Sequence, residues 1–330
     1  MSERSELLRT WLSEVLDTSN FEIRPASEDA SFRSYHRVFL QGDTYIVMDA
    51  PPQHEDCKPF IDITGRLLSC DVKAPVIYHK SLEYGFLLLS DFGNELYLKN
   101  LNQESADELY KNAIKTLAKI QARGSIEGLN PYDEKLLRTE MALFNDWLLA
   151  EHLQIKLTDM VNKKLQVVFD LLVKNALQQP RVFVHRDYHS RNLMLTEHNI
   201  PGVLDYQDAV LGPLSYDLVS LLKDCYIKWE PEQINAWVDY YLEQLAHQTG
   251  EFNIDKQQFQ RWFDLMGVQR HLKASGIFTR LSHRDNKHGF LKDIPRTLSY
   301  IVDLGPAYPE LTPLYQIIED SVLPALEQKS

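Results

Sequence analysis

The chain has 330 residues, enough for two lobes and a substantial core, and its 44% hydrophobic and 25% charged residues are ordinary for a soluble globular protein. A formal net charge of −12 argues against a nucleic-acid partner, because no overall positive field would gather phosphates. Three cysteines without CxxC spacing argue against a disulfide framework and favour a reducing compartment.

The amino terminus lacks the basic-then-apolar order of a signal peptide, and no apolar stretch has the length of a membrane span. We therefore expect a cytoplasmic protein without a membrane partner. A monomer is favoured, although the sequence leaves the oligomeric state open.

Residues 1–91 predict a small antiparallel sheet with helices. An apolar stripe over residues 5–16 indicates a helix, and β-type patterns follow, with a hairpin turn at Gln41-Gly42-Asp43. A short helix over 57–69 and strands over 72–77 and 86–89 complete this lobe.

Residues 92–330 are mainly helical in pattern. Predicted helices end near Gly124 and cover about 134–152 and 156–177, a buried helix follows Gly212-Pro213, and helical patterns continue from 230 to the end. The fold class is thus α+β in two lobes, a small amino-terminal lobe over 1–91 and a larger, mainly helical one over 92–330.

A polar loop between two apolar runs carries the most specific pattern. His185-Arg186-Asp187 and Asn192 read H-R-D-x-x-x-x-N, and Asp205 ends a short apolar strand thirteen residues further on. In phosphoryl transfer, such an Asp faces a substrate hydroxyl while Asn and Asp oxygens hold Mg²⁺. We predict a small-molecule kinase with His185, Asp187 and Arg191 at the catalytic centre and Asn192 and Asp205 as metal ligands.

Two alternatives stay open for this loop. An HxD triplet alone is most often a turn in which Asp caps its own backbone. His185, Asp187 and His189 could also be zinc ligands of a hydrolase, although no second cluster with ligand spacing is evident. Asp217, which heads the buried helix, is either a helix N-terminal carboxylate or an acceptor for the backbone of the catalytic loop, and both roles are structural.

Nucleotide contacts are expected from two segments of the first lobe. The turn that contains Ser31, Phe32 and Arg33 lies where a kinase covers the phosphates, and Arg37 could add charge, but the turn has no glycine. Residues 87–91 are predicted to form the hinge whose backbone binds adenine, with Leu89, Ser90 and Asp91 as the nucleotide contacts. The literal D-F-G at 91–93 precedes the catalytic loop, so it is not the metal site.

A basic segment stands out from the acidic background. Residues 269–296 hold seven Lys or Arg against two Asp. They form either a solvated helix face or a clamp for an anion at the mouth of the site.

With these motifs in place, the chain resembles the aminoglycoside phosphotransferase family, which has a protein-kinase-like fold. The resemblance covers most of the chain and is strongest from His185 to Leu222. Within the family, the chain most resembles the bacterial kinases that phosphorylate N-acetylmuramate and N-acetylglucosamine at the anomeric hydroxyl in the recycling of cell-wall sugars. The segments that carry this likeness are 47–52, 144–147, 204–209, 269–273 and 276–285.

The resemblance implies ATP and Mg²⁺ as cofactors and a small-molecule sugar as acceptor. It makes Asp187 the base, gives Mg²⁺ to Asn192 and Asp205, and lets Asp217 support the loop. Acceptor contacts would come from the second lobe. The sugar hydroxyls would be bonded by His189, Arg191, Gln207 and Asp208, and a lactyl anion would be held by Arg270 and Arg280.

The chain departs from the family in the third strand, which ends Val47-Met48-Asp49 where a lysine usually contacts the phosphates. Arg33, Arg37 or Lys58 would supply that charge, or Mg²⁺ and backbone donors suffice. A pseudokinase therefore stays open, as do kinases of aminoglycosides or of choline-like amines.

Overall fold

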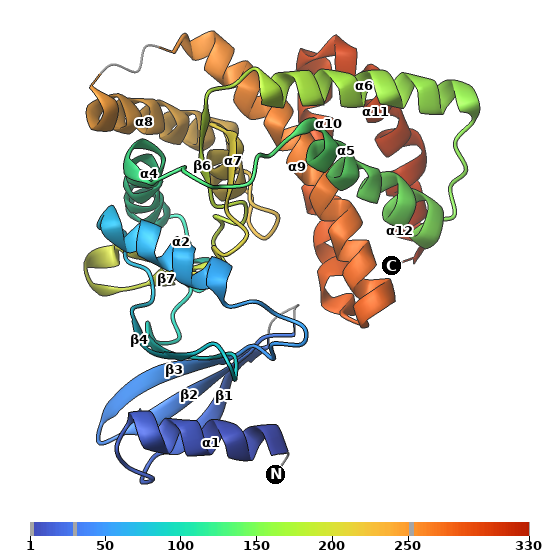
Figure 1. Cartoon of the computed structure of the whole chain (residues 1–330). Coiled ribbons are helices and arrows are strands. Elements are labelled where there is room, and N and C mark those ends of the chain that lie inside the picture. Colours follow the sequence, from blue (N-terminus) through green and yellow to red (C-terminus); the bar gives the residue numbers. More distant parts are fainter. Residues whose placement is uncertain (1–2, 29–31, 251–253, 330) are drawn as a thin grey trace.

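The computed structural model describes residues 3–28, 32–250 and 254–329. A five-stranded sheet with helix α1 forms one end of the molecule, and a mainly helical body forms the other (Figure 1). This confirms the bilobal α+β prediction. No helix of the described ranges is long and apolar enough to cross a membrane.

The sheet is antiparallel throughout, with the strand order β1-β2-β3-β5-β4. The predicted hairpin at Gln41-Gly42 joins two of its strands, since Gln41 and Gly42 both adopt the positive φ that such tight turns need. The strand bounds are β1 Glu22–Glu28, β2 Ser34–Leu40, β3 Asp43–Asp49, β4 Ile77–Ser81 and β5 Phe86–Ser90.

Alternate residues of the central strands serve two different cores, because side chains point to opposite faces with a period of two. Val47 and Leu88 pack toward α1 (Glu3–Val15), which covers the outer face of the sheet. Met48 and Leu87 belong to the larger core that continues into the helical lobe. The sheet is therefore held from both sides.

Helix α2 (Lys58–Ser69) joins the inner face of the sheet to the second lobe. Phe60 packs on the ring of Tyr206 with centroids 5.0 Å apart, and Thr64 Oγ1 lies 2.8 Å from the Tyr206 hydroxyl. The predicted strand over 72–77 was wrong: after α2, Val72 N–H donates to Leu67 O, and strand β4 begins only at Ile77. Pro75 has no N–H to offer a ladder.

The second lobe is organised around α9 (Lys256–Asp285), which descends through the middle of the helical body (Figure 1). Its residues are buried around most of the circumference, and it contacts α5, α6, α7 and α10. The helices around it are α3 Tyr97–Asn100, α4 Ala106–Arg123, α5 Glu134–Leu143, α6 Asp159–Leu177, α7 Tyr216–Leu222, α8 Pro231–Thr249, α10 Ile294–Leu304, α11 Thr312–Ile317 and α12 Leu323–Lys329.

Shorter elements complete this lobe. The predicted helix over 134–152 is α5 followed by a π-helical segment, and α9 crosses closely at their junction, where Gly276 lies against Leu143. The π-helices are η1 Phe144–His152 and η6 Ile318–Val322, and the 3₁₀ turns are η2 Glu197–Asn199, η3 His288–Asp293, η4 Gly305–Ala307 and η5 Pro309–Leu311. The short strands are β6 Arg181–Val184, β7 Leu193–Leu195, β8 Pro201–Val203 and β9 Val210–Pro213.

Candidate active site

A cleft of about 740 Å³ lies between the sheet and α9. Its walls bring together the hinge, the polar loop after β6, the end of β8 and one side of α9. The lining residues used below are Arg37, Leu89, Ser90, Asp91, Asp187, His189, Arg191, Asn192, Asp205, Tyr216, Cys225, Tyr226, Arg270, Lys273, Phe278 and Phe290.

Two antiparallel strand pairs hold the polar loop. Strand β6 pairs with β9 and delivers His185, while β7 pairs with β8 and carries the chain away from Asn192. The apolar residues of these pairs are buried in the main core, so both ends of the loop are fixed.

Asp217 fixes the beginning of the loop. It is fully buried and accepts hydrogen bonds from the backbone N–H of His185 (2.7 Å) and Arg186 (3.0 Å). Arg186 has a φ of +79°, a conformation that non-glycine residues rarely adopt, and these bonds stabilise it. Burial raises the pKa of Asp217 to about 7, although both N–H donors act to lower it.

His185 does not line the cleft, contrary to its predicted place at the catalytic centre. Its ring is fully buried, and Nδ1 accepts a hydrogen bond from the Asp187 backbone N–H at 3.2 Å. Burial lowers the pKa of His185 to about 4, so the ring is neutral near pH 7. The structure gives His185 a positioning role behind Asp187.

The side chain of Asp187 faces the cleft, and none of the described residues hydrogen-bonds its carboxylate. Burial alone would raise the pKa of Asp187, but Lys273, His189 and Arg270 outweigh it, and the pKa falls to about 2. The carboxylate is therefore ionised and free to accept a hydrogen bond from a ligand.

Asn192 and Asp205 lie against one another beside Asp187. Asn192 Nδ2 donates to the Asp187 carbonyl (3.0 Å) and to Asp205 Oδ2 (3.2 Å), which leaves the amide oxygen of Asn192 available. Such oxygens suit Mg²⁺, which binds one or two protein groups together with substrate phosphates. Within the described ranges, no three His, Cys, Asp or Glu side chains cluster as metal ligands, so the zinc-hydrolase alternative lacks support.

Leu89, Ser90 and Asp91, the predicted hinge residues, line the cleft, but Arg37 is already engaged. Its guanidinium donates to Asp91 at 2.5 and 3.0 Å and to the Gly93 carbonyl at 2.8 Å. Arg37 thus braces the hinge. It is not a free phosphate ligand.

The other predicted phosphate contacts are less favourably placed. Ser31 lies outside the described residues. Phe32 is 67% exposed and stacks on His54, and Arg33 Nε lies 4.0 Å from a Glu55 oxygen; neither lines the cleft. Met48 is completely buried in the core.

The end of the cleft opposite the hinge has an aromatic wall. Tyr226, Phe278 and Phe290 form it, with Phe278 and Phe290 stacked 5.6 Å apart. The guanidinium of Arg191 lies 4.6 Å from the Tyr226 ring centroid. His189 packs edge-on against Tyr226. This end therefore combines apolar surface with hydrogen-bond donors.

The basic segment divides into two parts. Arg270 and Lys273 line the cleft, whereas Arg280 does not. Gln207 and Asp208 also lie outside the cleft, and Gln207 Nε2 instead donates to Asp205 Oδ1 at 2.9 Å. None of these three predicted acceptor contacts lines the cleft.

Several residues that lie near Asp187 without bonding its carboxylate were not predicted from the sequence. Lys273, Glu140 and the aromatic wall come from different helices and turns, and no shared motif connects them. Only the local charge of the 269–296 segment could have indicated Lys273.

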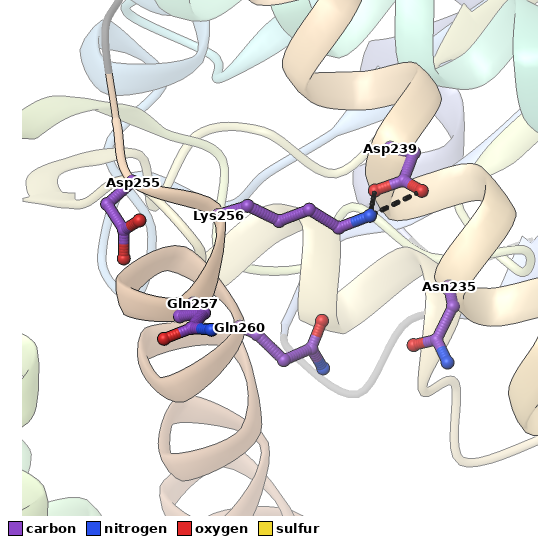
Figure 2. A pocket seen from close by; sticks show the side chains of 6 residues that line it. All are labelled: Asn235, Asp239, Asp255, Lys256, Gln257 and Gln260. Carbon is purple, nitrogen blue, oxygen red and sulfur yellow. Dashed lines mark hydrogen bonds and ion pairs between the residues drawn. The ribbon is translucent and has the colours of Figure 1, made fainter.

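A second hollow lies between the start of α9 and helix α8 (Figure 2). Lys256 bridges it to Asp239 with Nζ–O distances of 2.6 and 2.7 Å. The remaining lining shown there is Asn235, Asp255, Gln257 and Gln260. Because its cation is neutralised, this hollow offers no arrangement comparable to the Asp187 cleft.

Solved structures show which class this architecture belongs to. The fold resembles that of APH(2'')-IIa in its gentamicin complex, with a TM-score of 0.60 and 14% identity over 90% of this chain and 97% of that chain. It also resembles a Plasmodium vivax ethanolamine kinase, with a TM-score of 0.63 and 13% identity over 87% of this chain and 83% of that chain. A Cryptosporidium parvum choline kinase has a TM-score of 0.63 and 14% identity over 94% of this chain and 98% of that chain. The fold is that of the bilobal, kinase-like phosphotransferases.

The model of the phosphotransferase enzyme family (APH) matches residues 22–252, and the chain belongs to this family. Two relatives named N-acetylmuramate/N-acetylglucosamine kinase are similar over nearly the whole length. The Pseudomonas putida relative is 41% identical over 327 residues, 96% of each chain, and the Neisseria meningitidis relative is 39% identical over 326 residues, 97% of this chain and 96% of the other. A Pseudomonas aeruginosa relative of the same name is 46% identical over 298 residues, 90% and 88%.

Proposed function

We propose that this protein is an ATP- and Mg²⁺-dependent kinase that phosphorylates the anomeric hydroxyl of N-acetylmuramate and N-acetylglucosamine. The observation that carries the proposal is the unpartnered Asp187 carboxylate in a cleft beside Asn192 and Asp205. The names of the relatives support the choice of acceptor.

In this proposal, adenine binds at Leu89, Ser90 and Asp91, between lobes divided at residues 91 and 92. Asn192 and Asp205 would hold Mg²⁺, which neutralises charge on the phosphates when it is bound. Because Arg37 is engaged by the hinge and Met48 is buried, the protein would position the phosphates mainly through the metal and backbone donors.

Asp187 would orient the sugar hydroxyl for attack. The hydroxyl oxygen forms a bond to the γ-phosphorus while the bond from that phosphorus to the β,γ-bridging oxygen breaks, ADP leaves, and Asp187 accepts the hydroxyl proton. A pKa near 2 keeps this carboxylate ionised, so its main contribution is position. His185 and Asp217 hold the loop in place.

The test is ATP consumption with Mg²⁺ against N-acetylmuramate, N-acetylglucosamine, an aminoglycoside, choline and no acceptor. We expect turnover with the two amino sugars, with a loss of at least about 10³-fold in Asp187→Ala and Asp205→Asn. The matched control is Asp208→Asn, an exposed carboxylate outside the cleft, which should retain activity.

Other outcomes identify the alternatives. Turnover only with the aminoglycoside or choline would show that the protein is a kinase of this family with a different class of acceptor. Nucleotide binding without turnover on any acceptor would indicate a pseudokinase and contradict the proposal.

A further inference from the structure

We propose that Arg270 binds a carboxylate of the acceptor and so makes the cleft selective for an anionic sugar. This inference rests on the proposed function and deepens it. N-acetylmuramate differs from N-acetylglucosamine by a lactyl ether that carries a carboxylate, so the two acceptors differ in the group that Arg270 would recognise.

Arg270 is a buried cation that faces the cleft. It is only 5% exposed, yet it lines the same cavity as Asp187. Its contact with the protein is a long bond from Nη1 to Cys225 Sγ at 3.7 Å. Within the described part of the chain it makes no ion pair with a carboxylate. A buried charge without a partner is costly, and a bound anion would remove that cost.

The neighbouring cations differ from Arg270 in this respect. Lys273 pairs with Glu140 at 3.1 Å and donates to Tyr216 at 2.9 Å. Arg186 also pairs with Glu140, and Lys223 pairs with Asp264 at 2.7 Å. Arg270 is therefore the cleft cation of α9 whose donors remain available to a ligand.

The nearest carboxylates do not change this conclusion. Asp224 uses its oxygens on the Ser190 backbone N–H (3.0 Å), the Ser190 hydroxyl (2.5 Å) and the Tyr226 N–H (3.0 Å). Asp187 contributes negative charge near Arg270 but has no hydrogen bond to it. A guanidinium presents its N–H groups as a planar fork, which suits a carboxylate.

The surroundings of Arg270 suit a sugar as the carrier of that carboxylate. The wall of Tyr226, Phe278 and Phe290 supplies apolar surface for a pyranose face or an acetyl methyl group. Asp187 in the same cleft would receive the hydroxyl. An acceptor bound this way presents a hydroxyl to Asp187 and its anion to Arg270.

The experiment compares kcat/KM for N-acetylmuramate, its methyl ester and N-acetylglucosamine in the wild-type protein, Arg270→Gln, Arg270→Lys and Arg280→Gln. We expect Arg270→Gln to lower kcat/KM for N-acetylmuramate by about 10- to 100-fold, mainly through KM, because a charge-assisted hydrogen bond is lost. N-acetylglucosamine and the ester should change by less than about 3-fold. Arg270→Lys should retain part of the preference, and Arg280→Gln, outside the cleft, should retain all of it.

An equal loss for all three acceptors would overturn the proposal, because Arg270 would then act on the transferring phosphoryl group or on the fold. If the variants do not fold, the wild-type protein still tests the proposal through the ratio of kcat/KM for N-acetylmuramate to kcat/KM for its methyl ester. A ratio near one overturns the proposal. Calorimetric binding of N-acetylmuramate separates this inference from the proposed function. Arg270-dependent binding without turnover would support the inference while the proposed function fails, and no binding would overturn both.

Discussion

Glu140 and Lys273 form a buried ion pair beside the polar loop after β6, with Nζ 3.1 Å from Oε1. Arg186 Nη2 lies 2.5 Å from the same oxygen, and the Tyr132 hydroxyl and Gln269 Nε2 donate to Oε2. Two cations therefore share one carboxylate. Lys273 contributes most to lowering the pKa of Asp187 and Arg186 adds to it, together with His189 and Arg270, so this carboxyl stays ionised despite its desolvation.

Removal of Glu140 should destabilise the protein strongly. Glu140→Ala leaves two cations in a buried site without their partner, so we expect a loss of about 3–5 kcal/mol in the free energy of unfolding. The control is Glu134→Ala in the same helix, whose exposed pair with Arg138 should cost no more than about 0.5 kcal/mol. Urea denaturation measures both, and equal losses would contradict the network.

Lys273 should control the pH dependence of the reaction. With the pKa of Asp187 near 2, its ionisation should leave kcat/KM flat from about pH 5 to 8. Lys273→Met removes the cation that lowers this pKa most, so an acid limb should appear at higher pH. A profile unchanged in Lys273→Met would show that Asp187 does not depend on this cation.

The lowered pKa of Asp187 also affects the stability of the fold. The pKa of Asp187 is lower in the folded chain than in the unfolded chain, so the ionised group stabilises the fold above about pH 4. That contribution is lost as the pH falls toward 2.

Asp217 should be needed for the shape of the loop. In Asp217→Ala, the buried N–H groups of His185 and Arg186 lose their acceptor, and we expect a loss of about 2–5 kcal/mol of unfolding free energy. Asp217→Asn keeps one acceptor oxygen and should lose less. Hydrogen exchange at these two amides reports the effect directly; unchanged protection in Asp217→Ala would be the contrary result.

Arg37 should stabilise the hinge. The Asp91 side chain is only 3% exposed, so Arg37→Ala leaves a buried carboxylate unpaired, and we expect a loss of about 3 kcal/mol together with weaker nucleotide binding. Arg24→Ala is the matched control, because its pair with Glu22 on β1 is exposed. Thermal unfolding and ADP titration measure the two effects. Equal behaviour of the two variants would exclude the bracing role.

Gly276 should be sensitive to the smallest substitution. A Cβ there would lie 2.3 Å from the Leu143 carbonyl carbon, so Gly276→Ala should cost about 1–3 kcal/mol through overpacking. Gly65 lies in α2 with nothing within 4 Å of the added atom, and Gly65→Ala should stabilise the chain by about 0.5–1 kcal/mol. Shifts of the denaturation midpoint in opposite directions for the two variants would confirm the contrast. A neutral Gly276→Ala would refute the close crossing of α9 and α5.

The sequence alone determined the features that depend on local pattern. Alternating and helical periodicities located the sheet and most helices, since burial on one face repeats with the geometry of the element. The spacing of Asp187, Asn192 and Asp205 identified a candidate phosphoryl-transfer site, and two short antiparallel strand pairs hold the segment that carries these residues. The prediction of a strand over 72–77 was wrong because apolar residues alone do not distinguish a hydrogen-bonded strand from an extended connection.

Only the tertiary structure decided which residues face the cleft. Helix α9 is buried on nearly all sides, so its periodicity could not separate Arg270 and Lys273, which line the site, from Arg280, which does not. His185 belongs to the motif yet is buried behind it. Glu140 reaches Lys273 from a helix far away in sequence. Contacts of this kind depend on how several elements pack together, and neither composition nor spacing contains that information.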